Sequence, residues 1–397
     1  MKSRKVLALL VAAVFAFAGA AFAQDAPKAE EPKPVVDVSG VLFLDYAYYV
    51  KSDSGQEKAD NMRLTRAYLT FVKKFDDAWS ARVTVDGAGL GTINEYAGKD
   101  NDADDQFDEL TASEKANNIM FVKFAYVEMK QNFDPVELKI QYGIVGTPVI
   151  SIIDSTHGAR FIYNNYIDKS GDLLGKTGDT AGLKSHSLDV SSADMGVKAD
   201  LSVMKMVTLT GMYSNGDGFR YTEDQKLTDK AYWGMISITP LKGLFINGYY
   251  HTRDIVAVGA DDDEVTYYGG GLAWSDKSFK IGANYLIGER DSENVNQKAD
   301  YTVYEIWANI NLAEAVGVPV LLYGKYAVGA TESDAATGGF IQDVDGTTYY
   351  AGLGYQFNKA VQAMVVYQAQ KLEAKLVGGG KETARDNTLW VKTEVKF

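Results

Sequence analysis

From Val36 to its last residue the chain alternates apolar and polar residues, and this period of two limits what it can fold into. The stretch Asn387–Phe397 shows it most clearly, with Leu389, Val391, Val395 and Phe397 on one face and Lys392, Glu394 and Lys396 among those on the other. Successive side chains of a strand point to opposite faces. Each such segment is therefore predicted to be a strand with one apolar and one polar face.

The connections between these segments alternate in length. Short ones are expected near residues 74–78, 131–135, 204–206, 240–243, 275–278, 312–318 and 358–360. Long ones are expected near residues 51–61, 88–118, 146–191, 216–230, 254–263, 290–299, 329–345 and 372–386. A soluble sandwich gives no reason to place every long loop at one end, whereas an outer-membrane barrel has short periplasmic turns and long external loops. Residues 36–397 are thus predicted to form an all-β, transmembrane antiparallel β-barrel of about sixteen strands, each with roughly 9–11 spanning residues.

The first residues carry the features of an export signal. Lys2, Arg4 and Lys5 form a basic start, Val6–Ala18 is apolar, and Ala21-Phe22-Ala23 places small residues at the two positions read by signal peptidase. A membrane anchor is the alternative. We expect residues 1–23 to be a cleaved signal peptide and residues 24–35, which are polar and rich in Pro, to be a flexible periplasmic lead-in. The protein is then expected in the cell outer membrane.

Composition excludes several classes of function. The chain has no Cys, so disulfide frameworks, thiolate metal sites and cysteine nucleophiles are excluded. Its net charge of −13 argues against nucleic acid as a partner. Tyr (25) outnumbers Phe (17), as expected for a barrel whose aromatic girdles meet the lipid headgroups.

Three segments resemble Gram-negative outer-membrane porins. The C-terminal TLWVKTEVKF, which ends in Phe397, resembles the signal read by the outer-membrane assembly machinery. Arg63-Leu64-Thr65-Arg66-Ala67-Tyr68-Leu69 resembles the second strand of phosphate-selective porins and their relatives. Gly146-Thr147-Pro148, Arg160 and the stretch 191–196 (SSADMG) resemble exported porin-like proteins of unknown substrate. The resemblance covers residues 36–397 and implies a homotrimer in contact with outer-membrane lipid, lipopolysaccharide and that machinery.

The stretch Gly146–Ser191 is the longest connection and the third long one. In sixteen-stranded porins, by resemblance, the third external loop folds into the barrel and narrows it. The run Val149–Ile153 suits burial against the inner wall, and we expect Asp154, His157 and Arg160 near the narrowest point. An alternative role for Arg160 is to pair with a nearby acid and pin the loop.

The polar faces of the strands supply candidate pore-wall charges. The basic candidates are Arg66, Arg82, Lys139, Lys198, Lys280 and Lys325, and the acidic ones are Asp45, Asp86, Asp194, Asp200 and Glu305. This mixture is nearly balanced. Acidic runs at residues 95–114 and 261–264 lie in expected external loops, so the mouth is expected to favour cations.

Other chemistry is poorly supported by the sequence. Gly87–Gly91 lacks the third glycine of a dinucleotide loop. Asp100, Asp102, Asp104 and Asp108 match part of a calcium loop that lacks its Gly and closing Glu. The three His have no zinc spacing, and Ser185-His186-Ser187 has no orienting partner. We therefore expect no enzyme, no catalytic residue, no cofactor and no resident metal.

These observations favour one function and leave others open. The leading hypothesis is a porin, a water-filled channel for passive diffusion of small hydrophilic solutes and ions. One alternative is a substrate-selective channel for an anion such as phosphate, using Arg66, Arg82 and Arg160. Another is a non-transporting barrel that acts as an adhesin or structural protein, and a barrel enzyme is the last.

Overall fold

The computed structural model describes residues 36–53, 58, 60–88, 119–163, 165–166, 173, 190–216, 218–219, 230–255, 263–292, 297–333, 341–376 and 380–397. The expected signal peptide (1–23) and lead-in (24–35) lie outside these ranges, and so do the incomplete calcium loop and His186. Among the described residues, no helix is long and apolar enough to cross a membrane.

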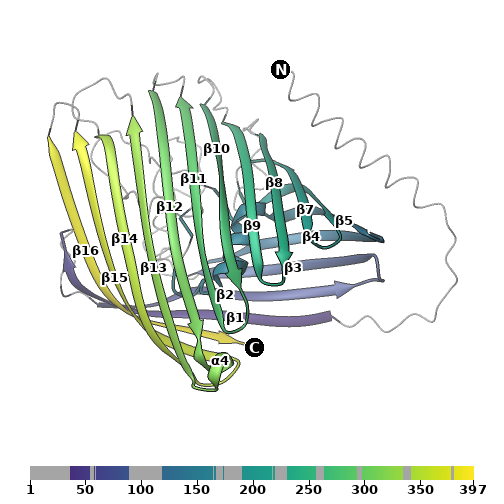
Figure 1. The fold of residues 1–397 in the computed structure, drawn as a ribbon, viewed down its shortest axis with the longest axis horizontal. Coiled ribbons are helices and arrows are strands. Elements are labelled where there is room, and N and C mark those ends of the chain that lie inside the picture. Colours follow the sequence, from purple (N-terminus) through teal and green to yellow (C-terminus); the bar gives the residue numbers. More distant parts are fainter. Residues whose placement is uncertain are drawn as a thin grey trace, which may run out of the picture. The chain divides into compact units, whose positions relative to one another are not determined.

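The described residues of the unit 36–397 form a closed barrel of sixteen antiparallel strands (Figure 1). Each strand pairs with its neighbours in sequence, and β1 pairs with β16. The strands are β1 (Val36–Ser52), β2 (Asp60–Lys74), β3 (Trp79–Ala88), β4 (Ile119–Phe133), β5 (Val136–Gly146), β6 (Ala193–Val203), β7 (Val207–Ser214), β8 (Lys230–Leu241), β9 (Leu244–Ile255), β10 (Asp263–Ser275), β11 (Phe279–Ser292), β12 (Gln297–Asn311), β13 (Val320–Ser333), β14 (Ile341–Gln356), β15 (Val361–Leu376) and β16 (Lys381–Lys396). The predicted fold class is confirmed.

Short turns join the strands at one end of the barrel, which we call the turn end, and we call the opposite end of the strands the loop end. The short connections follow β2, β4, β6, β8, β10, β12 and β14, as the sequence predicts, and the one after β12 holds the short helix α4 (Leu312–Val316) (Figure 1). Strand lengths run from 8 residues in β7 to 17 in β1. Many strands are longer than the expected 9–11 residues, because antiparallel pairing continues beyond the length needed to cross a bilayer.

Three of the short turns are held by the same side-chain device. The carboxylate of Asp76 accepts hydrogen bonds from the backbone N–H groups of Ala78 (2.8 Å) and Trp79 (2.7 Å). Asp276 and Asn358 do the same for the residues two and three positions after them. Asx side chains satisfy turn amides in this way without further secondary structure. These turns are therefore encoded locally.

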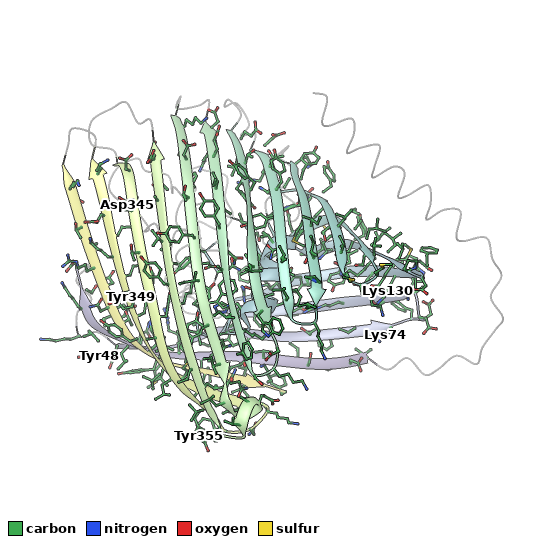
Figure 2. All side chains as sticks on the ribbon, viewed as in Figure 1. Tyr48, Lys74, Lys130, Asp345, Tyr349 and Tyr355 are labelled. Atoms are coloured by element: carbon green, nitrogen blue, oxygen red, sulfur yellow. The ribbon has the colours of Figure 1, made fainter. Side chains whose placement is uncertain are left out.

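The two faces of the barrel wall differ in chemistry. Outward-facing side chains such as Tyr349 (47% exposed) and Leu353 (60% exposed) are apolar or aromatic, whereas the neighbouring inward-facing Thr348 is fully buried. Figure 2 shows Tyr349 along β14 and Tyr355 near its turn end, with Lys74 and Lys130 at the turn ends of β2 and β4. An apolar exterior around a polar interior is the pattern of a barrel that sits in lipid.

The two ends of the chain meet where the barrel closes. The N–H of Gly40 donates to the carbonyl oxygen of Phe397 (2.7 Å), and the N–H of Phe397 donates to the carbonyl oxygen of Gly40 (3.0 Å). A Cβ placed on Gly40 would lie 2.2 Å from the Phe397 ring. The ring therefore covers the bare backbone of Gly40, an arrangement in which an aromatic residue shields a strand glycine.

We predict that Gly40→Val lowers the folded yield by displacing the Phe397 ring from the seam, and that deletion of Phe397 lowers it further because the backbone pair is lost as well. The measurement is the fraction of heat-modifiable, folded protein in outer-membrane extracts. Gly324→Val is the matched control, since a Cβ at Gly324 meets no atom within 4 Å. Equal folded yields for wild type and both seam variants would contradict this account of the closure.

Candidate functional site: the narrowed lumen

The long connection between β5 and β6 begins with a helix, α2 (Pro148–His157). Thr147 is its N-cap, Pro148 occupies the first turn, and Gly158 ends it in the left-handed conformation (φ 68°). Proline suits a first helical turn and glycine suits the position after a helix. The expected β-branched run Val149–Ile153 is thus helical, and its signal in the sequence was this Pro and Gly spacing.

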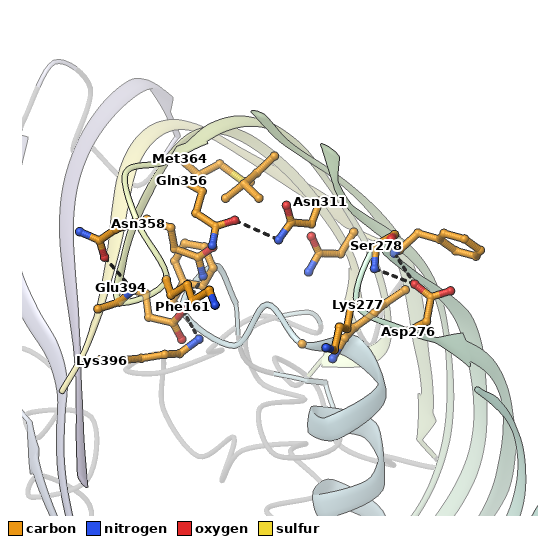
Figure 3. Close-up of a pocket in the computed structure, with 18 residues that line it drawn as sticks. Phe161, Asp276, Lys277, Ser278, Asn311, Gln356, Asn358, Met364, Glu394 and Lys396 are labelled. Atoms are coloured by element: carbon orange, nitrogen blue, oxygen red, sulfur yellow. Dashed lines mark hydrogen bonds and ion pairs between the residues drawn. The ribbon is translucent and has the colours of Figure 1, made fainter. Parts of the chain in front are cut away.

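Helix α2 lies inside the barrel and packs against β8, β10, β11 and β12 (Figure 3). Val149, Ile150 and Ile153 are at most 1% exposed. Burial of each such side chain contributes about 1.5–3 kcal/mol. In the last turn of the helix, the carbonyl oxygen of Ser155 accepts a hydrogen bond from the ammonium of Lys280 (3.0 Å). A cation at this C-terminal end also complements the helix dipole.

The base of this connection is tied where it leaves and re-enters the wall. The hydroxyl of Thr147 donates to the carbonyl oxygen of Ser191 (3.0 Å), and the N–H of Thr147 donates to the carbonyl oxygen of Ser192 (3.2 Å). The Asp194 carboxylate then accepts from the N–H groups of Gly216 (2.7 Å) and Gly218 (3.2 Å). The two sequence segments that resemble porin-like proteins are therefore neighbours that anchor one loop and the start of the next.

A buried polar cluster fastens the segment after α2 to the barrel wall. The His157 ring lies 2.9 Å (Nε2 to Oη) from Tyr323 of β13, and the Tyr163 hydroxyl donates to Glu305 of β12 (3.2 Å). Glu305 also pairs with Lys325 (2.7 Å), whose ammonium lies over the ring of Tyr163. All five residues are less than 10% exposed. We call them the latch.

The three residues expected at the narrowest point divide between two roles. His157 is 2% exposed and is turned toward the wall as part of the latch. Arg160 pairs with Asp154, and the amide of Asn165 donates to the same carboxylate (2.9 Å). The side chains of Arg160 and Asp154 keep 16% and 27% exposure. The pairing that would pin the loop is therefore present, on side chains that are still partly exposed.

The inner wall of β1–β4 and β16 carries a group of cations that we call the basic wall cluster, namely Arg63, Arg66, Arg82, Lys123 and Lys392. Arg66 lies 2.7 Å from Asp86, and Lys123 lies 3.8 Å from the same carboxylate. Lys392 (2.9 Å) and Arg63 (3.5 Å) share Asp45. Counted with Asp45 and Asp86, these five cations carry a net charge of +3.

Two β-bulges place cations of this cluster inside the barrel. The pairing of β1 with β2 skips Thr65, so both Arg63 (opposite Asp45) and Arg66 (opposite Phe43) face inward. The pairing of β3 with β4 skips Lys123, which is 4% exposed. A bulge adds one residue to one strand and re-aims the side chains that follow. Strict alternation would have put Arg63 and Arg66 on opposite faces.

Residues beyond α2 reach the side of the barrel that carries the basic wall cluster. The Phe161 ring lies 6.4 Å from the Phe43 ring of β1, which in turn lies 5.9 Å from that of Tyr68 on β2. Arg160 is close enough to Tyr68 to interact with it electrostatically. The loop thus contacts the β8–β13 wall through α2 and the latch, and β1 through Phe161.

The other predicted wall residues are distributed around the lumen. Lys139 pairs with Asp200 (2.8 Å), and Lys198 donates to the carbonyl oxygen of Gly146 (3.1 Å). Arg82 donates to Thr84 (3.1 Å) and lies over the Phe124 ring. Lys280 and Lys325 bind the loop, as described above. Sequence reasoning missed Lys123, Lys392 and the tyrosines of the latch. Of these, Lys392 stood on the polar face of β16 and could have been found there.

Burial lowers the pKa of His157 well below its usual value, and the charges of Lys325, Lys280 and Arg160 lower it further. His157 is therefore neutral near pH 7 and forms the latch in that state. Among the described residues, no group of three or more His, Asp or Glu could hold a metal ion.

The described residues thus form a closed barrel of sixteen antiparallel strands with a helix-bearing loop folded into a charged lumen. No protein-family model matches the sequence, and no curated protein is similar to it in sequence. Solved structures match its fold. One is the trimer form of OmpT, an outer membrane protein of Vibrio cholerae (16% identical, covering 92% of this chain and 99% of that one, TM-score 0.58).

Two further structures match to a similar degree. The outer membrane channel DcaP of Acinetobacter baumannii is 12% identical and covers 94% of this chain and 100% of that one, with a TM-score of 0.56. An anion-selective porin from Comamonas acidovorans is 11% identical and covers 92% of this chain and 100% of that one, with a TM-score of 0.60. At these identities the likeness shows a shared fold.

We predict that the latch weakens in acid. Because the pKa of His157 is lower in the folded protein than in the unfolded chain, its contribution to stability is complete above about pH 6.5 and is lost as the pH falls below that value. The thermal unfolding midpoint of the purified protein in detergent should fall more between pH 7.5 and 5 in the wild type than in His157→Gln. The other described His, His251 of β9, is buried and is present in both proteins, so any effect of its own titration is the same in both. Parallel declines would rule out this role for His157.

Proposed function

We propose that the protein is an outer-membrane channel through which small hydrophilic solutes and ions diffuse passively, with the connection 146–191 narrowing its lumen. The observation that carries this proposal is a charged inner wall with a helix-bearing loop folded against it. A barrel of sixteen strands encloses an aqueous lumen, and a polar lining with an inserted loop sets a size limit for solutes.

Features of the exterior and of two segments expected to carry signals support a location and an assembly route. The apolar, tyrosine-rich outer face and the export signal expected at residues 1–23 support insertion into the outer membrane, in contact with lipid and lipopolysaccharide. Phe397, whose ring covers Gly40, is the expected signal for the assembly machinery. The neighbour solved in a trimer form supports a homotrimer. The structural neighbours include an outer membrane channel and an anion-selective porin, which favours a non-enzymatic role.

The charges of the lumen favour anions at the constriction. The basic wall cluster, counted with Asp45 and Asp86, carries +3, whereas Arg160 and Asp154 offset each other. The acidic external loops expected from the sequence would attract cations to the mouth. Charges in a narrow lumen of reduced dielectric act on a passing ion more strongly than exposed charges, which salt screens over about 8 Å. We therefore favour a modest anion preference, as in the alternative that uses Arg66, Arg82 and Arg160, with Arg66 and Arg82 rather than the paired Arg160 as its main charges.

Conductance separates this proposal from a non-transporting barrel that serves as an adhesin or structural protein. Purified protein in planar bilayers should give discrete conductance steps in KCl. Folded protein that inserts without conducting would overturn the channel proposal.

We predict that Arg66→Gln shifts the reversal potential in a KCl gradient toward cations while the barrel still folds, because Lys123 remains beside Asp86. One unit charge about 4 Å from an ion contributes about 1 kcal/mol in bulk water and more at lower dielectric, which corresponds to at least about a fivefold change in permeability ratio. Lys298→Gln is the control, since Lys298 is 44% exposed near the loop end. An unchanged ratio in Arg66→Gln at low salt would refute the role of the cluster.

We also predict that Arg160→Ala raises cation selectivity and conductance. The change removes the guanidinium and leaves Asp154 with Asn165 as its described partner, so the local charge becomes negative. Single-channel recording of the folded variant measures both quantities. If neither changes, Arg160 does not lie on the ion path.

A further inference from the structure

A cavity of about 160 Å³ lies at the turn end of the lumen, just beyond the end of α2 (Figure 3). It is lined by the residues after α2 and by the turn ends of β11, β12, β14, β15 and β16. This volume exceeds that needed for a single water molecule many times over. The cavity can therefore hold a small organic solute.

Five side-chain amides contribute to the polar lining of this cavity. They come from neighbouring strands and turns and belong to Asn309, Asn311, Gln356, Asn358 and Gln362. Several use one half of the amide to hold their own position. Asn311 donates to the Gln356 oxygen (3.1 Å), Asn358 uses its oxygen for its turn, and Gln362 donates to Glu394 (Figure 3).

The remaining halves of these amides form a mixed set of donors and acceptors. Four of these amides keep polar groups that take part in no other hydrogen bond between described residues. These groups are the NH₂ groups of Gln356 and Asn358, the oxygen of Gln362, and both the oxygen and the NH₂ group of Asn309. An amide both donates and accepts. Fixed amides of both polarities match the hydroxyl groups of a sugar-like molecule, which also do both.

The charges around the cavity favour an anion. Four lysines line it, namely Lys277, Lys280, Lys359 and Lys396, against the two carboxylates of Asp276 and Glu394. Both carboxylates are already engaged, as are Lys280 with the carbonyl oxygen of Ser155 and Lys396 with Glu394. Asp276 accepts from the Trp274 indole N–H and from two turn amides, which lowers its pKa, and Glu394 binds Gln362 and Lys396 (2.7 Å). The cavity thus has an excess of two positive charges.

Apolar side chains complete the lining. Phe161 follows α2, and Leu321 and Met364 stand on the wall, all three at most 5% exposed. Amides and ammonium groups beside an apolar surface suit a ligand that has both hydroxyl groups and a hydrocarbon face.

We propose that this cavity is a binding site for a small polyhydroxylated carboxylate, that is, a sugar acid, at the turn end of the channel. The amides bind its hydroxyl groups, and the lysine ammonium groups bind its carboxylate. The inference rests on the proposed channel function for the delivery of the solute, and it names the class of solute that the lumen retains.

Binding is tested by titration calorimetry on the folded protein in detergent, with gluconate as the probe. The key variant is Asn309→Leu. Leu is similar in size to Asn but lacks the amide that would bind the solute, and the change breaks no hydrogen bond between described residues. Gln131→Leu is the matched control, an amide at the turn end of β4 outside this cavity. We expect saturable gluconate binding by wild type and Gln131→Leu, and at least about tenfold weaker binding by Asn309→Leu.

Three results would overturn the proposal: no saturable binding of gluconate by the wild type, equal affinity in Asn309→Leu, or binding of glucose or sulfate as tight as that of gluconate. Conductance in KCl, measured on the same preparations, tests the channel separately. A conducting protein that does not bind gluconate overturns this site alone. A protein that binds gluconate without conducting supports the site and overturns the proposed channel.

Discussion

The structure depends on one constraint: in lipid, every backbone N–H and C=O must find its partner within the protein. An open sheet would leave two edges unpaired, so β1 must pair with β16. That closure occurs at the last residue of the chain, where Gly40 and Phe397 exchange backbone hydrogen bonds. Local turns such as the one held by Asp76 bring sequence neighbours together, but this final pairing joins residues from opposite ends of the chain.

Closure also determines how the interior must be built. Charged residues that face inward lose part of their contact with water, which is costly unless they are paired. The wall accordingly holds ion pairs between adjacent strands, such as Arg66 with Asp86 and Asp45 with Lys392. Because Asp45 and Asp86 are each shared by two cations, pairing is satisfied while an excess of positive charge remains. The same arrangement therefore provides stability and underlies the anion preference that we propose.

The inner wall has two different regions, and the loop 146–191 contacts both. On the β8–β13 side, the apolar face of α2 and the latch residues are buried as in the core of a soluble protein. On the other side, the loop presents Arg160 and Phe161 toward β1 and β2, near the basic wall cluster. One region holds the loop in place, and the other supplies the charges that a solute would meet in the proposed channel. The channel and its proposed turn-end site both depend on this division.

The sequence by itself determined the alternating strands, the positions of all seven short turns and the barrel class, because these follow from side-chain period and local turn chemistry. It also placed Arg66, Asp86, Glu305 and Lys325 on the inner face. The tertiary structure alone decided the bulges at Thr65 and Lys123, the packing of α2 against β8, β10, β11 and β12, and the burial of His157 against Tyr323. A bulge depends on the partner strand. The position where a loop packs depends on a wall formed by strands far away in sequence. Neither therefore leaves a periodic signal in the chain.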